Sequence, residues 1–260
     1  MKIASWNVNS IRIRIEHVVD WLRDAEPDVL ALQELKATSE QVPVDMLEAC
    51  GYTVAVAGQK GFNGVALASR YPLEGVVTGL PGNEDDDAAR YIEAWVDAPA
   101  GRGVRVGCIY LPNGNPVESP KFPYKLDWMS HLQVQAERLL ELEEAAVLAG
   151  DFNVCPTDRD LADPASMRDD ALCRPESRAR FRRLLHLGYT DAYRDLHPDS
   201  EEVYTYWDYG RAFDDNRGLR IDHLLLSPQA ADRLEACDVD IRPRTRKRPS
   251  DHAPIWCVLA

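Results

Sequence analysis

Several runs of apolar residues in this chain end in acidic or amide residues. The most continuous run covers residues 145–149, and Gly150 closes it before Asp151 and Asn153. An unbroken apolar run of this length predicts a strand buried on both faces. Asp151 and Asn153 are two positions apart, so on extended backbone their side chains point the same way. The pair is suited to hold a hard cation, or a phosphate and a water, but it equally fits an Asx-turn that only closes the strand.

The same patterns predict the other elements of the chain. Apolar residues at helical spacing indicate helices over residues 11–23, 44–50, 125–144 and 176–187. Strands are predicted over 2–9, 29–32, 52–57, 65–68, 90–96, 104–110, 203–207, 221–226, 237–241 and 255–259. No linker rich in Gly, Pro or Ser divides the chain, and no short repeat is present. Many strands, some joined by hairpins, with a few helices between them predict an α/β fold of two packed sheets covered by helices.

Length and composition exclude several classes of protein. The 260 residues, 45% of them hydrophobic, suffice to bury a full core in one domain. No apolar stretch approaches the roughly 18–20 residues that span a bilayer, and the first residues lack the apolar segment of a signal peptide. The six cysteines are scattered without a C-x-x-C motif. We therefore expect reduced thiols, no zinc site, no membrane partner and a cytoplasmic protein.

The net charge of −13 argues at first against a nucleic-acid partner, because an acidic surface repels a polyanion. The charges are unevenly distributed, however. Acidic residues gather in runs such as 84–87 and 199–202, whereas basic residues cluster at 174–183, 211–220 and 242–248. Arginine makes up 24 of the 30 basic residues. Its planar fork suits phosphate oxygens, although base composition of the genome explains the same bias equally well.

Eight polar residues have the same kind of location in the chain: each closes a predicted strand or follows it directly. These residues offer carboxylate and amide oxygens, and none of them is a cysteine. Such a ligand set suits Mg²⁺ or Mn²⁺ rather than zinc. Any one of these residues fits an ordinary loop, but their joint placement predicts a site at one edge of the sheets. They are Asn7, Glu34, Tyr110, Asp151, Asn153, Asp222, Asp251 and His252.

The motifs around these residues resemble those of the exonuclease III family of DNA-repair nucleases, within the exonuclease–endonuclease–phosphatase superfamily. In chain order they are W-N-V-N-S, L-Q-E-L-K, G-V-A-L-A-S-R, I-Y-L-P-N-G, S-P-K-F-P-Y-K, G-D-F-N-V-C-P-T-D, D-N-R-G-L-R-I-D-H and P-S-D-H-A-P. The resemblance spans residues 1–260 and implies one DNase I-like domain, a four-layered α/β sandwich of two mostly antiparallel sheets flanked by helices. It also implies metal-dependent hydrolysis of phosphodiester bonds in duplex DNA by a monomer associated with the nucleoid. The implied activities are 3′ to 5′ exonuclease action, trimming of blocked 3′ ends and incision at abasic sites.

Matched residue by residue, the resemblance implies a role for each site residue. Glu34 would be the main metal ligand, with Asn7 and Asp251 beside it. Asp151, Asn153 and His252 would complete the metal site. Asp151 and Asn153 would also hold the nucleophilic water and the phosphate. Asp222 and His252 would form a carboxylate–imidazole pair, and Tyr110 would point at the scissile phosphate. Either Asp151 or His252 would be the general base, with one or two ions acting.

The resemblance also implies contacts with DNA. Arg90, Asn113 and Lys121 match positions on the DNA face of the family. Tyr206, Trp207 and Leu219 match an apolar group that enters the minor groove around the target nucleotide. For Trp207 a half-buried strand position is the other interpretation.

The chain departs from the family pattern in one segment, and two functions other than a DNA-repair nuclease are alternatives. Residues 167–178 match only loosely and resemble the shorter form found in members that trim 3′ ends and incise abasic sites poorly. A phosphodiesterase that acts on a phospholipid or a small phosphorylated substrate is the alternative enzyme, and activity on duplex DNA discriminates it. A catalytically inactive DNA-binding protein would lack at least one ligand, whereas all eight positions hold competent residue types.

Overall fold

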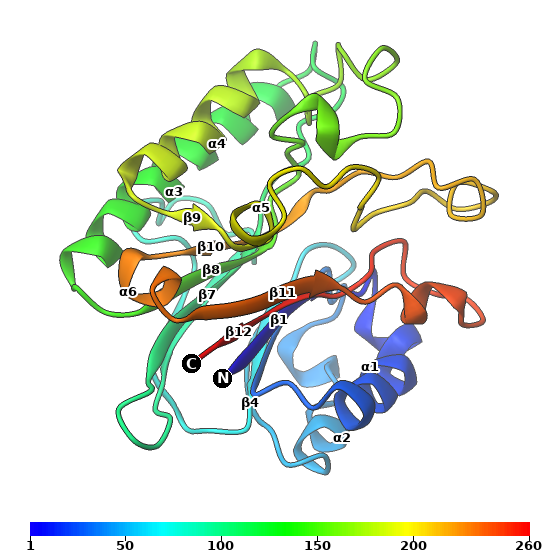
Figure 1. Cartoon of the computed structure of the whole chain (residues 1–260). Helices are drawn as coiled ribbons and strands as arrows, with labels where there is room; N and C mark the ends of the chain where they lie inside the picture. The colour runs from blue at the N-terminus through cyan, green and yellow to red at the C-terminus, as the bar shows by residue number, and fades with distance from the viewer.

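Two six-stranded sheets pack face to face, and helices cover both outer faces (Figure 1). The computed structural model describes residues 1–260. The first sheet has the order β11-β12-β1-β2-β4-β3 and consists of β1 (Lys2–Asn7), β2 (Val29–Gln33), β3 (Thr53–Ala57), β4 (Val65–Ser69), β11 (Leu234–Val239) and β12 (Ile255–Leu259). The second has the order β5-β6-β7-β8-β10-β9 and consists of β5 (Leu73–Thr78), β6 (Tyr91–Val96), β7 (Val104–Tyr110), β8 (Ala146–Asp151), β9 (Thr190–Asp191) and β10 (Asp222–Leu226).

Each sheet contains one parallel pair among antiparallel neighbours. These pairs are β1–β2 and β7–β8. The first sheet is covered by α1 (Ile11–Ala25) and α2 (Val44–Glu48), the second by α3 (Lys121–Glu141) and α4 (Pro175–Leu187) (Figure 1). The short helices α5 (Ala192–Leu196) and α6 (Pro228–Ala231) add side chains to the core between the sheets. The four layers and the mostly antiparallel sheets confirm the predicted fold class.

The alternation of side chains along the strands explains why both faces of each sheet are apolar. In β1, Ile3 packs in the core between the sheets, whereas Ala4 and Trp6 pack against α1 and its neighbours. In β8, Val147 faces the same central core and Leu148 faces α3 and α4. Strands buried on both faces read as continuous apolar runs, which is the pattern that predicted them.

The structure corrects several predicted elements. Helix α3 begins at Lys121 rather than 125, because Pro123 lies in the first turn, where its missing N–H leaves no hydrogen bond unmade. Residues 203–207 do not form a strand, and Tyr206 makes only isolated bridges to Leu219 and His252. Strand β5 was missed because it is an exposed edge strand, held by pairing with β6 rather than by an apolar pattern. No helix in this fold is both long and apolar enough to cross a membrane.

The end of β8 fits closely against its neighbours. A Cβ atom at Gly150 would lie 2.0 Å from the carbonyl oxygen of Ile109 in β7, so only glycine fits there. In the strand register, Asp151 lies beside Tyr110 on one side and Asp222 on the other. Three of the predicted site residues are therefore neighbours in one sheet.

A buried ion cluster anchors the chain just before β10. The Arg220 side chain is fully buried, and it donates from Nε to Asp160 Oδ1 at 2.7 Å and from Nη1 to Asp191 Oδ2 at 2.9 Å. Burial alone would raise the pKa of Asp160, but Arg220 and Arg194 outweigh it and lower this pKa to about 2. The cluster thereby fixes the segment that leads into Asp222.

We predict that Arg220→Met destabilises the protein by about 3–5 kcal/mol at pH 7, because two buried carboxylates lose their shared cation. Arg217→Met is the matched control. This neighbouring arginine is 65% exposed in its ion pair with Asp215, so its loss is expected to cost less than about 1 kcal/mol. Urea unfolding of both variants measures the difference.

The destabilisation by Arg220→Met also depends on pH. A carboxyl with a lowered folded-state pKa stabilises the fold above its unfolded pKa of about 3.9, and this contribution is lost as pH falls toward 2. Without Arg220, burial raises the pKa of Asp191, and Asp160 keeps only Arg194 as its cation, so the two carboxyls take up protons at a less acidic pH than in wild type. The gap between wild type and variant is therefore expected to shrink between pH 7 and pH 4. An unchanged gap would contradict the assignment.

Candidate active site

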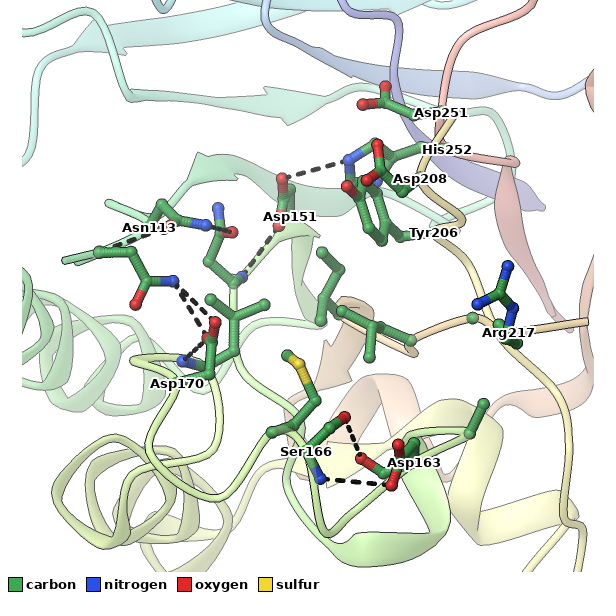
Figure 2. A pocket seen from close by; sticks show the side chains of 18 of the residues that line it. Asn113, Asp151, Asp163, Ser166, Asp170, Tyr206, Asp208, Arg217, Asp251 and His252 are labelled. Atoms are coloured by element: carbon green, nitrogen blue, oxygen red, sulfur yellow. Dashed lines mark hydrogen bonds and ion pairs between the residues drawn. The ribbon is translucent and has the colours of Figure 1, made fainter. Parts of the chain in front are cut away.

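The parallel strand pairs and their antiparallel neighbours bring all eight predicted site residues to one rim of the sandwich. Asn7 and Tyr110 end β1 and β7, and Asp151 ends β8. Glu34 follows β2, Asp222 begins β10, and Asp251 and His252 precede β12. The rim borders a cavity of about 650 Å³, at one end of which Asp151, Asp251, His252 and Tyr206 gather (Figure 2).

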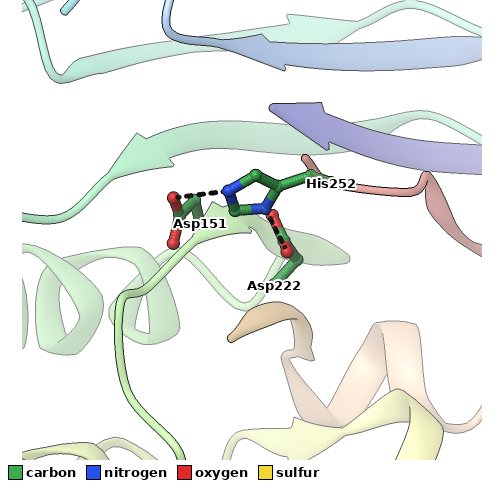
Figure 3. A group of neighbouring side chains, drawn as sticks. All are labelled: Asp151, Asp222 and His252. Carbon is green, nitrogen blue, oxygen red and sulfur yellow. Dashed lines mark hydrogen bonds and ion pairs between the residues drawn. The ribbon is translucent and has the colours of Figure 1, made fainter. Parts of the chain in front are cut away.

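His252, which lines this cavity, lies between the carboxylates of Asp151 and Asp222 (Figure 3). Its Nδ1 is 2.8 Å from Asp222 Oδ2, and its Nε2 is 3.8 Å from Asp151 Oδ2. All three side chains are buried, and their ligand-capable atoms lie within 4.8 Å of one another. The hydrogen bond from Nδ1 to Asp222 leaves Nε2 directed toward Asp151 and the cavity.

Burial and close charges shift the protonation of this group. Burial raises the pKa of Asp151 above its ordinary value, with His252 acting against it. Burial alone would lower the pKa of His252, but Asp222 and then Asp151 outweigh it and raise this pKa. The imidazole and the Asp151 carboxyl, both with a raised pKa, therefore lie 3.8 Å apart at the cavity, an arrangement suited to general acid–base chemistry.

Asn7 connects this group to Glu34. Its Nδ2 donates to Glu34 Oε1 at 2.9 Å and to Asp151 Oδ2 at 3.0 Å, and its Oδ1 accepts from the Asn9 backbone N–H at 3.0 Å. In this orientation the side-chain N–H groups of Asn7 point toward the carboxylates of Glu34 and Asp151. Asn7 therefore orients Glu34 and Asp151, and its own oxygen accepts one hydrogen bond.

Two residues that the sequence did not single out complete this network. Asn9 donates from Nδ2 to Asp251 Oδ1 at 3.0 Å and accepts at Oδ1 from Lys36 Nζ at 2.6 Å. Lys36 Nζ is also 2.8 Å from Glu34 Oε2. Burial alone would raise the pKa of Glu34, but the hydrogen bonds from Asn7 and Lys36 lower it and keep the carboxylate charged. The only sequence signal for Asn9 is its two-residue spacing from Asn7.

Asn153 takes part in the Asx-turn, which is one of the two interpretations that the sequence left open for the Asp151–Asn153 pair. Its backbone N–H donates to Asp151 Oδ1 at 2.9 Å, which is the Asx-turn. Its side chain donates from Nδ2 to the Leu111 carbonyl at 2.9 Å, and its Oδ1 accepts from Asn113 Nδ2 at 3.0 Å. The turn thus leaves Asp151 Oδ2 free to face Asn7 and His252.

The donor set at the rim fits a hard divalent cation. Glu34, Asp151 and Asp251 all line the cavity and offer carboxylate oxygens without any thiolate. Asp222 Oδ1 is buried next to this set and has no hydrogen-bond partner. This acidic cluster could bind a metal ion.

An apolar wall faces the carboxylates across the cavity. Tyr206 and Leu219 belong to it, together with Met167, Leu172 and Ile221. The Tyr206 ring lies edge-on to the His252 imidazole, with centroids 5.0 Å apart. The sequence did not reveal these three additional residues, since each also fits an ordinary core position.

Trp207 is placed differently from the DNA-contacting expectation. Only 3% of it is exposed, its Nε1 donates to Asn216 Oδ1 at 3.1 Å, and its ring packs against Phe213. Its neighbour Tyr206 faces the cavity instead, because successive residues of an extended segment point in opposite directions. Trp207 therefore supports the wall from behind and has no surface to offer to DNA.

The remaining predicted DNA contacts differ in position and exposure. Asn113 is exposed and lines it, and Lys121 is exposed at the first residue of α3. Arg90 is half-buried, with its guanidinium 4.9 Å from the centre of the Tyr110 ring and its Nη1 donating to the Tyr110 carbonyl at 3.2 Å. Arg90 thus also holds the end of β7 in place.

Comparison with known proteins agrees with this geometry. Residues 4–252 match the model of the endonuclease/exonuclease/phosphatase family. Exodeoxyribonuclease III of Haemophilus influenzae is 34% identical over 98% of both chains. Among solved structures, a 3′-5′ exonuclease from Neisseria meningitidis is 40% identical and an AP endonuclease from Archaeoglobus fulgidus 35% identical. Each of the two superposes with a TM-score of 0.94 and covers 100% of this chain and 99% of its own. The chain therefore belongs to the endonuclease/exonuclease/phosphatase family and, within it, to the exonuclease III group of DNA-repair nucleases.

Proposed function

We propose that this chain is a Mg²⁺-dependent exodeoxyribonuclease of the exonuclease III type that removes nucleotides from 3′ ends of duplex DNA, trims blocked 3′ ends and cuts at abasic sites. The observation that carries the proposal is the joint placement of the His252–Asp222 pair, Asp151 and the carboxylates of Glu34 and Asp251 at one cavity. We further propose that residues 1–260 act as a single domain and as a monomer, since this one cavity draws its residues from both sheets. The six free cysteines support a cytoplasmic location.

Glu34 and Asp251 would hold the ion, with Asp151 beside them and Asn153 and His252 at the edge of the same group. Mg²⁺ suits an all-oxygen site, and Mn²⁺ has similar preferences. When bound, the ion supplies positive charge that neutralises the non-bridging oxygens of a phosphate. Asn7 and Lys36 would keep the Glu34 carboxylate oriented and charged for this purpose.

The chain's own groups would then act on the water and the phosphate. Asp151 or His252 would take the proton from the attacking water, since both face the cavity and lie 3.8 Å apart. Asp222 would fix the imidazole through its 2.8 Å contact to Nδ1. Asn153 and Asn113 would hold phosphate oxygens, and Tyr110 would face the scissile phosphate from the end of β7. Donors placed in this way stabilise charge as it develops in the transition state.

For DNA contacts we retain Arg90, Asn113, Lys121, Tyr206 and Leu219 and leave out Trp207. A relative that is 40% identical over the full chain, described as a 3′ phosphatase from Neisseria, has been solved bound to a product DNA hairpin. This supports a duplex substrate with a 3′ end. The apolar wall with Tyr206 and Leu219 would then contact the sugar and base of the terminal or abasic nucleotide.

The activity is tested with an end-labelled duplex that carries one central abasic site, incubated in Mg²⁺ and in EDTA. We expect Mg²⁺-dependent products that shorten from the 3′ end, and a cut at the lesion would add abasic-site incision to the activity. A receding ladder with the lesion uncut would restrict the enzyme to 3′ ends. No Mg²⁺-dependent product of either kind would contradict the nuclease proposal and direct the search to phospholipid substrates.

We predict that Asp151→Asn lowers kcat for cleavage at least about 10³-fold, because it removes both a ligand and a candidate base. The fold should remain intact, since the amide relieves repulsion among buried carboxylates. Asp199→Asn is the control, because that carboxylate is 97% exposed and does not line the cavity. Thermal unfolding accompanies the kinetics. Activity within tenfold of wild type in Asp151→Asn would contradict its assigned role.

A further inference from the structure

A fully buried lysine lies directly beneath the cavity. Lys125 in α3 has no exposed surface, and its Nζ donates to the Asn153 carbonyl at 2.5 Å and to the Asn113 carbonyl at 3.0 Å. No carboxylate forms an ion pair with it. Burial lowers the pKa of Lys125 to about 7, with Asp151 acting against it. A buried cation without a paired anion costs stability, and an apolar side chain of the same length would fill this space without that cost.

The two carbonyls that Lys125 binds belong to the two amide residues of the site. Asn113 follows β7, and Asn153 follows β8. Their side chains are joined by the 3.0 Å hydrogen bond from Asn113 Nδ2 to Asn153 Oδ1. Lys125 thus holds the backbones of both loops from below while their side chains meet at the cavity.

The loop after β7 is shaped around the lysine stem. Gly114 has a φ of 93°, and a Cβ atom there would lie 2.6 Å from Lys125 Cδ and 3.1 Å from Ala171 Cβ. Asn115 ties the same loop to the 170–172 segment, donating from Nδ2 to Asp170 Oδ1 at 3.1 Å and accepting at Oδ1 from the Ala171 N–H at 3.0 Å. The position of Asn113 is therefore set by Lys125 and by this neighbouring contact together.

We propose that Lys125 is a positioning residue for phosphodiester cleavage, in which its ammonium fixes the Asn113 and Asn153 loops so that their amides meet the scissile phosphate. The inference rests on the proposed nuclease function. Lys125 itself does not line the cavity. It acts in the transition state more than in DNA binding, because the exposed contacts such as Lys121 do not depend on it.

Lys125→Met tests this role, because methionine fills similar space without donating. We expect kcat on a 3′-recessed duplex to fall about 100-fold, the loss that a misplacement of about 1 Å can cause, while KM for DNA stays within threefold. The matched control is Gln135→Met in the same helix. Gln135 is also buried and donates to Glu93 Oε2 at 2.9 Å, away from the site. That variant should lose stability but keep kcat below its unfolding temperature.

A double-mutant cycle separates positioning from a general structural effect. In an Asn113→Ala/Asn153→Ala background, Lys125→Met should lower kcat by less than threefold further, because the side-chain amides that Lys125 is proposed to position are already gone. Side-chain amide resonances of Asn113 and Asn153 give a readout without turnover and should shift or broaden in Lys125→Met only. If Lys125→Met does not fold, Lys125→Gln replaces it, with an expected loss of about tenfold because its shorter amide reaches at most one carbonyl.

Three results would overturn the proposal. The first is wild-type kcat and unshifted amide resonances in Lys125→Met, or in Lys125→Gln where that variant is used. The second is an equal loss in Gln135→Met. The third is a full 100-fold further loss in the double-alanine background. Failure of the nuclease proposal itself is distinct, since wild type would then show no cleavage of the duplex at all.

Discussion

The site depends on hydrogen bonds that cross from one sheet to the other. Asn7 at the end of β1 donates to Asp151 at the end of β8, and His252 before β12 meets Asp222 at the start of β10. Each pair unites a residue of the first sheet with one of the second. These contacts form only because the two sheets pack face to face with the parallel pairs β1–β2 and β7–β8 ending at the same rim. The apolar core between the sheets is thus what brings the polar groups together.

The buried carboxylates and imidazole at the rim lower the stability of the fold, but they form a site that can bind a cation. Asp151, Asp222 and His252 are all buried, Asp222 Oδ1 has no partner, and Glu34, Asn9 and Asn153 adopt the left-handed backbone region that non-glycine residues usually avoid. Sites that hold like charges and strained backbone commonly cost stability. A divalent cation would offset that charge. It would also give the acidic protein, with its net charge of −13, a local means of binding a phosphate.

The sequence predicted the strands buried on both faces and, from them, the edge at which Asp151 and its companions meet. The sequence did not predict strand β5 or the isolated bridges of Tyr206. Both are held by pairing with neighbouring segments and carry no apolar pattern of their own. The resemblance named Asn7 as a ligand, whereas the direction of its amide emerges only from its partners in space. Lys125 and Asn9 were missed because each acts through contacts distant in sequence, to Asn153 and Asp251. Trp207 and Tyr206 are adjacent in sequence, and only the packing decides which of them faces the cavity.

The central claim is that the carboxylates at the rim form a single cation-binding group. Anomalous diffraction from crystals soaked in Mn²⁺ tests it most directly. We predict a peak in the cavity within about 2.0–2.3 Å of oxygen atoms of Glu34 and Asp251, and its loss in crystals of Glu34→Gln. A peak elsewhere on the surface, or a cavity without Mn²⁺ at millimolar concentration, would contradict the account.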